Sequence, residues 1–304
     1  MISVSLCMIV KDEERVLERC LNSFAPLVDE IVIVDTGSSD STKAIAARYT
    51  DKLYDFSWTG NFSEARNFAF SKCSCEYIYS ADADEMIDEE NAAQFRILKE
   101  VMDPQVELVQ MWYVNRHPFR TTENYEKDLR PKLFRRLREF VWIDPVHETV
   151  RLDPLVFDSD IEILHMPEGQ HAGRDFSVFL RELGAGRGLS ERLWHMYAQE
   201  LFIAGETADL TAAAPYFEQR KEEAMSPEAC AEACCVLARE AGMRGDAAGL
   251  FKNVLDGSTV CMCSELCLEM EAYYRKEDNS AEAERWKEMA EETEALLVEN
   301  FVEN

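Results

Sequence analysis

The chain has 304 residues, of which 47% are hydrophobic and 30% charged, a composition typical of a folded globular protein and not of a disordered or collagen-like chain. The length predicts about two domains. Thirty-two basic and 59 acidic residues give a net charge of −27, and so acidic a surface repels phosphate backbones and anionic lipid head groups. Nucleic acid and membrane-surface binding are therefore excluded as main functions, and an anionic substrate would need a local feature that offsets this charge.

The sequence also carries information on its compartment. No apolar run is long enough for a transmembrane helix, and the opening segment MISVSL lacks the basic stretch and cleavage site of a signal peptide. We therefore expect a cytoplasmic protein whose ten cysteines are free thiols, because the cytoplasm is reducing. Six cysteines gather between residues 230 and 267, but none has the CxxC spacing of a zinc site, so we interpret them as packing residues of helices.

The first part of the sequence alternates strand and helix patterns. The predicted strands are Ser3–Val10, Glu30–Val34, Lys52–Phe56 and Glu76–Ala81. The predicted helices between them are Asp12–Phe24, Thr42–Tyr49 and Asn61–Cys73. This alternation predicts an α/β fold with a mostly parallel sheet that helices cover on both faces.

From about residue 107 the pattern changes to strands separated by polar loops. The strand-like runs are Leu108–Val114, Lys132–Phe134, Val141–Ile143, Thr149–Leu152 and Ile161–Leu164. Because no helical pattern lies between them, we expect an antiparallel extension of the sheet that forms a wall facing the acceptor.

After about residue 175 the patterns are all helical. The predicted helices are Ser190–Ala204, Leu210–Ala224, Pro227–Ala241, Ala247–Leu255, Ser264–Arg275 and Ala281–Val298. They fall in pairs at a spacing of about 35 residues, near the length of a tetratricopeptide repeat. We therefore predict two domains, 1–174 and 175–304, the second an all-α helical-repeat domain that holds 27 acidic and 12 basic residues.

The segment Asp82-Ala83-Asp84-Glu85 lies at the carboxyl end of a predicted strand. Ligands of open α/β sheets bind beyond such strand ends. Two carboxylates one residue apart can both face that crevice, and hard oxygen ligands suit Mg²⁺ or Mn²⁺, which bridge phosphates. The alternative is an ordinary polar exit from a strand.

Two further groups point to nucleotide chemistry. Asp35 ends the second strand in the segment DTGSSD, where its carboxylate could accept hydrogen bonds from a base or a ribose. A capped helix start explains Ser39 and Asp40 but does not explain Asp35. Arg66, on the helix before the fourth strand, could hold a phosphate with two hydrogen bonds, or it could pair with Glu64 at the surface.

Four segments stand in the order of a known family: Ser5–Glu14, Asp29–Thr42, Phe62–Asn67 and Asp82–Glu85. Together they resemble the family 2 glycosyltransferases, which have the GT-A fold, and they resemble most a bacterial subgroup with a C-terminal tetratricopeptide-like helical domain. The resemblance is dense to about residue 90 and thinner to about residue 170. It implies metal-dependent transfer of a sugar from a nucleotide-sugar donor, with UDP expected, to a protein, peptide or glycan acceptor, with inversion at the anomeric carbon.

The resemblance also implies roles for single residues. Val10 and the residues just after it line the nucleoside pocket, Asp35 contacts the base, and Arg66 lies near the nucleotide. Asp82 contacts the ribose or the metal, and Asp84 is the main ligand of a Mn²⁺ or Mg²⁺ ion in the DXD motif.

Two more segments are similar to the same subgroup. Pro145–Glu148 matches its "HE" segment, and Ile161–His165 matches a strand that ends in His. A histidine that faces a metal-binding carboxylate makes chemical sense as a further ligand, so His165 and His147 are candidate metal ligands, against the alternative of ordinary surface histidines. Asp12 stands where the family often has Asn.

Inverting transfer needs a general base that deprotonates the acceptor, and Glu148, ahead of Asp144, is our candidate. A divalent cation and Arg66 would stabilise the negative charge on the leaving diphosphate, so a protein of charge −27 could still bind a nucleotide. The helical domain would recognise the acceptor or form a homodimer. The alternative is a non-enzymatic interaction scaffold on helical repeats, with an inert transferase domain. A nucleotidyltransferase is disfavoured because Lys11 stands among acidic residues instead of in a glycine-rich basic loop.

Overall fold

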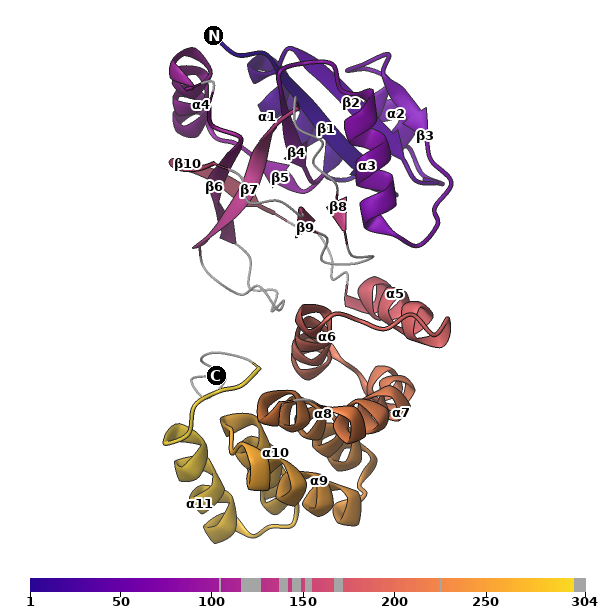
Figure 1. Cartoon of the computed structure of the whole chain (residues 1–304), viewed down its shortest axis with the longest axis vertical. Helices are drawn as coiled ribbons and strands as arrows, with labels where there is room; N and C mark the ends of the chain where they lie inside the picture. Colours follow the sequence, from indigo (N-terminus) through magenta and orange to yellow (C-terminus); the bar gives the residue numbers. More distant parts are fainter. Residues whose placement is uncertain are drawn as a thin grey trace. The chain divides into compact units, whose positions relative to one another are not determined.

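The structure is a computed structural model that describes residues 1–103, 105–115, 127–136, 142–143, 149–150, 155–166, 172–224 and 226–297 (Figure 1). The chain divides into two compact units, and the boundary between them lies between residues 170 and 171. No described helix combines the length and the apolar composition that a membrane crossing needs.

The first unit is built on a mixed sheet with the strand order β3-β2-β1-β4-β7-β6-β10-β5. The strands are β1 Val4–Val10, β2 Glu30–Asp35, β3 Leu53–Asp55, β4 Tyr77–Ala81, β5 Glu85–Met86, β6 Leu108–Asn115, β7 Lys127–Arg135 and β10 Val156–His165. β1 pairs in parallel with β2 and β4, whereas β7 is antiparallel to both of its neighbours and β5 is antiparallel to β10. The predicted mostly parallel sheet with an antiparallel extension is confirmed as a mixed sheet, with the difference that β6 and β10 of the extension pair in parallel. Two short strands, β8 Trp142–Ile143 and β9 Thr149–Val150, pair separately.

Helices cover the two faces of this sheet. They are α1 Leu17–Phe24, with the short 3-10 helix η1 Ala25–Leu27, α2 Thr42–Ala46, α3 Phe62–Lys72 and α4 Glu89–Val101. Side chains alternate along a strand, so Leu6 and Met8 of β1 pack into the core shared with α1 and α4, while Cys7 packs into the core under α3. Strand β1 therefore contributes side chains to the cores on both faces of the sheet. Because β1, β2 and β4 are parallel, their carboxyl ends lie at the same edge of the sheet.

Two elements of this unit escape the sequence patterns. Helix α4 is one. It carries an N-cap signal in its sequence, because the Asp88 side chain accepts a hydrogen bond from the Asn91 N–H at 3.0 Å, but the patterns above predict no helix there. Strand β5 is the other, because two residues give no periodicity and only the pairing with β10 defines them. Helix α1 also begins at Leu17, later than predicted: the φ of 55° excludes Asp12 from a right-handed helix, and the N–H groups of Val16 and Leu17 close a turn on the Glu13 carbonyl before the helix starts.

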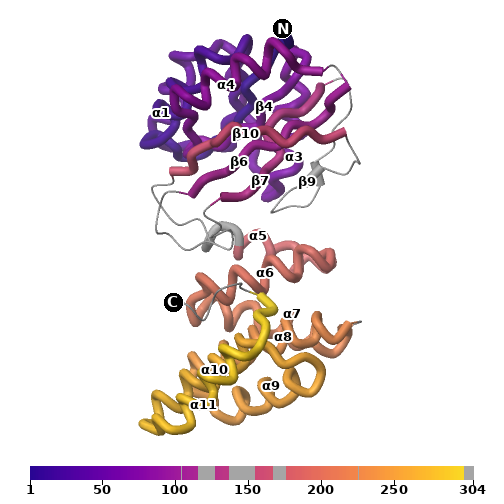
Figure 2. Tube along the Cα trace, turned by 90° about the vertical axis from the view of Figure 1, so that its left-hand side faces the viewer, coloured from indigo at the N-terminus to yellow at the C-terminus, as the bar shows by residue number. Residues whose placement is uncertain are grey.

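The second unit is all α, as predicted. Its helices are α5 Ala172–Gly184, α6 Glu191–Ala204, α7 Thr207–Glu223, α8 Pro227–Arg244, α9 Ala247–Val260, α10 Ser264–Lys276 and α11 Ser280–Glu291 (Figure 2). Ser190 and Ser226 cap α6 and α8 through their side chains, and Gly245 ends α8 with a left-handed φ of 76°. All ten cysteines lie in the described part of the chain and are free thiols.

One helix of this unit is shorter than the sequence predicts. The apolar pattern predicts a helix up to Val298, but α11 ends at Glu291. The backbone N–H groups of Leu296 and Leu297 donate instead to the carboxylate of Glu265, on α10. A tertiary contact has therefore replaced the helical hydrogen bonds that the local sequence favours.

Candidate active site

Asp35 ends β2 directly opposite Val10 of β1 in the parallel register. Its side chain is buried, and its Oδ1 atom accepts hydrogen bonds from the backbone N–H groups of Gly37 at 3.0 Å and Ser38 at 2.9 Å. Gly37 has a φ of 109°, a conformation that favours glycine at this turn. The other oxygen, Oδ2, has no hydrogen-bond partner among the described residues. A buried carboxylate oxygen without a donor is costly, so a ligand N–H group there would be bound favourably.

The loops that follow β1 and β2 are joined by hydrogen bonds. The backbone N–H of Asp12 donates to Ser38 Oγ at 2.9 Å, and Asp12 Oδ1 accepts from the Ser39 N–H at 2.7 Å. The left-handed conformation of Asp12 is one that Asp and Asn both tolerate, which explains why either residue suits this position. Val10 is 3% exposed, and its carbonyl accepts hydrogen bonds from the Thr36 N–H at 3.0 Å and the Thr36 hydroxyl at 3.2 Å.

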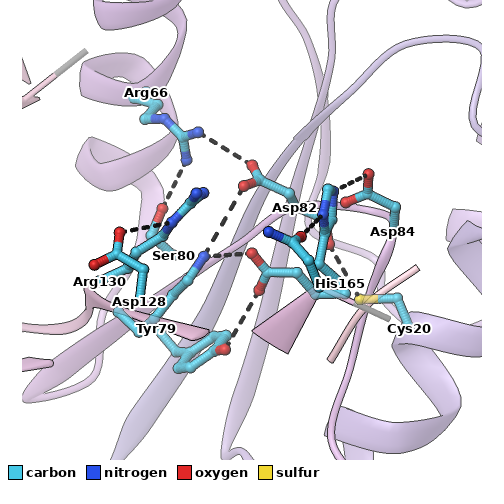
Figure 3. Close-up of polar contacts among 12 residues, drawn as sticks. Cys20, Arg66, Tyr79, Ser80, Asp82, Asp84, Asp128, Arg130 and His165 are labelled. Carbon is cyan, nitrogen blue, oxygen red and sulfur yellow. Dashed lines mark hydrogen bonds and ion pairs between the residues drawn. The ribbon is translucent and has the colours of Figure 1, made fainter. Parts of the chain in front are cut away.

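Arg66 extends from α3 to the end of β4 (Figure 3). Its guanidinium donates to Ser80 Oγ at 2.7 Å and to Asp82 Oδ1 at 3.1 Å. Burial alone would raise the pKa of Asp82, but the positive charges of Arg66 and Lys132 outweigh it and hold that pKa well below its usual range. The structure thus pairs Arg66 with Asp82, and the guanidinium is fixed beside the DXD motif.

Asp84 meets His165 because β5 pairs with β10, which sets Glu85 opposite His165. The Nε2 atom of His165 lies 3.0 Å from Asp84 Oδ2, and Nδ1 lies 2.6 Å from the side-chain oxygen of Asn115 (Figure 3). Because an amide oxygen only accepts, Nδ1 is assigned the proton. The Nε2 atom then either carries a second proton, which it donates to the Asp84 carboxylate, or presents a lone pair, so that Nε2 and the carboxylate can bind the same cation.

The side chains at this edge of the sheet fit a divalent metal ion as a partial set of ligands. No three Asp, Glu, His or Cys side chains converge into a complete metal site within the described ranges. Asp82 is turned to Arg66 and Lys132, so Asp84 and His165 are the two side chains that fit as ligands. Mg²⁺ and Mn²⁺ are commonly held by one or two carboxylates together with water and substrate phosphates. His147, Glu148 and Asp144 lie outside the described residues.

A buried ion pair that no sequence pattern above predicts lies beneath this site. Glu85 is 0% exposed, and its carboxylate pairs with Nζ of Lys132, from β7. The Tyr79 hydroxyl donates to the same carboxylate at 3.4 Å, and Lys132 Nζ also lies 3.9 Å from Asp82 Oδ2. Burial raises the pKa of Glu85 to about 7, although Lys132 opposes that shift. A lysine inside an otherwise apolar strand, Lys132-Leu133-Phe134, is the signal that could have revealed this pair.

Comparisons with known proteins agree with this geometry. Residues 5–151 match the family model described as glycosyl transferase family 2. This part of the chain belongs to that family. The predicted family and its GT-A fold, with the mixed sheet described above, are confirmed for this unit.

Two relatives illustrate how far the similarity extends. A TPR repeat-containing protein of Synechococcus elongatus is 41% identical over 112 residues, which are 33% of this chain and 28% of the relative. The lipopolysaccharide core biosynthesis glycosyltransferase LpsC of Rhizobium meliloti is 33% identical over 144 residues, 44% of this chain and 51% of LpsC. The chain therefore spans about half or less of the length of these curated relatives.

Two solved structures resemble this chain at low sequence identity. TarS of S. aureus in complex with UDP-GlcNAc is 14% identical, covers 95% of this chain and 92% of its own, and has a TM-score of 0.43. Glucosyl-3-phosphoglycerate synthase of Mycobacterium tuberculosis is 16% identical, covers 62% and 82% respectively, and has a TM-score of 0.47. A likeness of this degree says nothing of the ligands of this chain.

A pocket with a volume of about 350 Å³ lies in the second unit, between α8, α9 and α10. Its lining includes Arg239, Glu269, Tyr273 and Lys276. Arg239 and Glu269 form an ion pair at 3.2 Å, so their charges largely cancel. None of the predicted site residues lines this pocket, and the candidate active site is placed at the strand ends of the first unit.

Proposed function

We propose that this chain transfers a sugar from a UDP-sugar donor to a protein, peptide or glycan acceptor. The observation that carries the proposal is the Asp84–His165 pair at 3.0 Å, next to an Arg66 guanidinium that Asp82 holds in place. The family 2 match supports glycosyl transfer as the reaction class. The name of LpsC, a lipopolysaccharide core biosynthesis enzyme, supports a glycan among the acceptors.

The nucleoside would bind at the ends of β1 and β2. The Oδ2 atom of Asp35 has no donor among the described residues, and the N3–H group of uracil is a donor of the kind it needs. The joined loops around Asp12 and Ser38 would form the wall beside the base. Cytosine has no N–H at that ring position, so this contact favours uridine nucleotides.

The diphosphate would bind between Asp84 and Arg66. Asp84 and His165 would hold a Mn²⁺ or Mg²⁺ ion, with Asn115 fixing the imidazole so that Nε2 presents its lone pair. When bound, such an ion supplies positive charge that stabilises the leaving diphosphate. Arg66 would donate to a phosphate oxygen, and its hydrogen bond to Ser80 keeps the guanidinium oriented for that contact. These local cations would offset the acidic charge of the whole chain.

The acceptor hydroxyl would lose its proton to a carboxylate and attack the anomeric carbon on the face opposite the diphosphate. This geometry inverts the anomeric centre. Glu148 remains our candidate base and Asp144 the second, both on sequence grounds alone.

The test is release of UDP from a panel of UDP-sugars by the full chain, with Mn²⁺ and after chelation. Asp84→Asn keeps the side-chain volume but removes a charged ligand, and we expect it to lose at least about 99% of the metal-dependent activity. The same change at the exposed Asp51 is the matched control and should leave activity unchanged. Full activity of Asp84→Asn would refute the mechanism, and a chain that binds no nucleotide would favour the interaction scaffold. Sedimentation of the full chain tests the expected homodimer separately.

A further inference from the structure

The non-helical segment after α11 lies against α6 and α10 and is held by its main chain. The backbone N–H of Ser264 donates to the carbonyl of Glu294 at 3.1 Å. The side-chain amide of Gln199 donates to the carbonyl of Leu297 at 2.5 Å. Both contacts involve main-chain atoms that every residue of a peptide carries, so they do not depend on the side chains of this segment.

A buried carboxylate supplies the strongest part of the attachment. Glu265, the second residue of α10, is 0% exposed. Its oxygens accept hydrogen bonds from two successive backbone N–H groups, those of Leu296 at 3.0 Å and Leu297 at 2.6 Å. Successive N–H groups that converge on one anion form a compact binding arrangement, and hydrogen bonds to a charged acceptor are stronger than neutral ones. Glu265 therefore recognises a peptide backbone.

One side chain of the segment is enclosed. Leu297 is 2% exposed, whereas Glu294 is exposed and Leu296 is half-buried. Among residues 294–297 only Leu297 has a fully enclosed side chain, and main-chain hydrogen bonds flank it. This combination of one enclosed apolar side chain and several backbone contacts is how proteins bind short peptides.

The charge of the segment is unfavourable for the site it occupies. Residues 175–304 hold 27 acidic and 12 basic residues, and the acidic ones include Glu292 and Glu294 of the segment and Glu291, the last residue of α11. A peptide with the same backbone contacts and basic residues in place of these glutamates would gain attraction where the segment meets repulsion. The electrostatics therefore favour a basic peptide over the resident segment.

We propose that Gln199, Ser264 and Glu265 form a peptide-binding site that residues 294–297 fill as an exchangeable internal ligand. Its external ligand is a basic peptide that carries a leucine-sized side chain and two free backbone N–H groups. The resident segment is tethered to α11, which gives it a local concentration on the order of 1 mM, so it competes well despite its charge. This proposal concerns the helical unit and does not depend on the sugar-transfer reaction.

The test uses the full chain and a labelled peptide. The peptide has the sequence of residues 291–298 with Glu291→Lys, Glu292→Lys and Glu294→Lys, and binding is followed by fluorescence anisotropy. In the chain, Leu297→Asp removes the enclosed side chain and should displace the segment. We take a dissociation constant on the order of 0.1 mM for a segment of this kind and a local concentration of the tethered segment of about 1 mM. The resident segment then weakens binding of the external peptide to wild type by about tenfold, so the variant should bind the peptide about tenfold more tightly than wild type.

Controls separate recognition from general loosening. Glu294→Asp keeps the charge of an exposed side chain of the same segment and should leave peptide affinity at the wild-type value. Adding Gln199→Leu to Leu297→Asp removes the donor to the Leu297 carbonyl and should abolish the gain. Equal affinity of wild type and Leu297→Asp, or no binding by the folded variant, would overturn the proposal. A wild-type dimer that Leu297→Asp dissociates would also overturn it, because the segment would then belong to a second copy.

Hydrogen exchange of the wild-type chain decides the question if Leu297→Asp fails to fold. An exchangeable segment opens without unfolding α10, so the N–H groups of Leu296 and Leu297 should exchange at least about 100-fold faster than those in the centre of α10. Equal protection of the two sets of N–H groups would show that the segment is a permanent part of the fold and would refute the proposal.

Discussion

The buried pair of Glu85 and Lys132 leads to a prediction with an unusual dependence on pH. Lys132 is 6% exposed and Glu85 is 0% exposed, so neither charge is solvated by bulk water. Lys132→Met keeps a side chain of similar length and removes the cation that contacts Glu85 in the described part of the structure. The carboxyl of Glu85 then becomes neutral, because an isolated buried carboxylate is far costlier than a bound proton.

The size of the effect follows from the pKa of Glu85. This pKa is raised from its ordinary value of 4.5 to about 7. Between pH 4.5 and pH 7 the folded chain therefore keeps a proton on Glu85 that the unfolded chain has released. The resulting contribution favours the folded state at low pH and is lost as pH rises. In Lys132→Met the carboxyl stays neutral above pH 7, at a cost of about 1.4 kcal/mol per pH unit. The free energy of unfolding should thus fall by less than about 1 kcal/mol at pH 7, about 1.4 kcal/mol at pH 8 and about 2.7 kcal/mol at pH 9.

Urea unfolding of the first unit, followed at pH 7, 8 and 9, measures this cost. Lys127→Met is the matched control, because Lys127 pairs with Glu162 where both side chains are over a third exposed, and its effect should be small at all three values. Adding Glu85→Gln to Lys132→Met should remove the slope with pH. A loss of stability that is constant from pH 7 to pH 9 would refute the reasoning.

Three further outcomes are expected. Arg66→Met removes the hydrogen bonds to Ser80 and Asp82 and should weaken UDP binding by about tenfold or more in calorimetry, with little effect on binding of the metal alone. Burial would raise the pKa of Glu30, but hydrogen bonds from Lys52, Ser5 and Ser74 outweigh it and lower that pKa to about 2. The ionised carboxylate therefore stabilises the fold by about 3 kcal/mol above pH 4.5, and this contribution is lost as pH falls towards 2. Glu30→Gln should lack this acid-sensitive part of the free energy of unfolding in urea titrations. Asp12→Asn should change stability by less than about 0.5 kcal/mol, whereas Asp12→Val should cost about 1–2 kcal/mol through its left-handed backbone.

The residues that could be predicted from the sequence share one property. Asp35 ends β2, and Asp82 and Asp84 come within three residues of the end of β4. Parallel strands present their carboxyl ends at one edge of a sheet, so local patterns suffice to group these residues. His165 likewise ends a predicted strand. Their chemistry could be predicted because carboxylates at two neighbouring strand ends, together with a histidine, form a set that a single polar strand exit does not explain.

The remaining site residues depend on pairings that no local pattern contains. Lys132 reaches Glu85 because β7 inserts between β4 and β6, and Asn115 reaches His165 because β6 and β10 pair in parallel. Both contacts join residues that are about 50 positions apart in the chain. The same cause explains the error at α11, where Glu265 binds the N–H groups that the apolar pattern had assigned to a helix.

Calorimetric titration of UDP into the full chain, with and without Mn²⁺, tests most directly the claim that Asp84 and His165 hold a cation that binds the nucleotide. We predict that Mn²⁺ tightens UDP binding by at least about tenfold in wild type and changes it less than about twofold in Asp84→Asn and His165→Ala. Binding of UDP that is equally tight without Mn²⁺, or a full response to Mn²⁺ in Asp84→Asn, would contradict the claim.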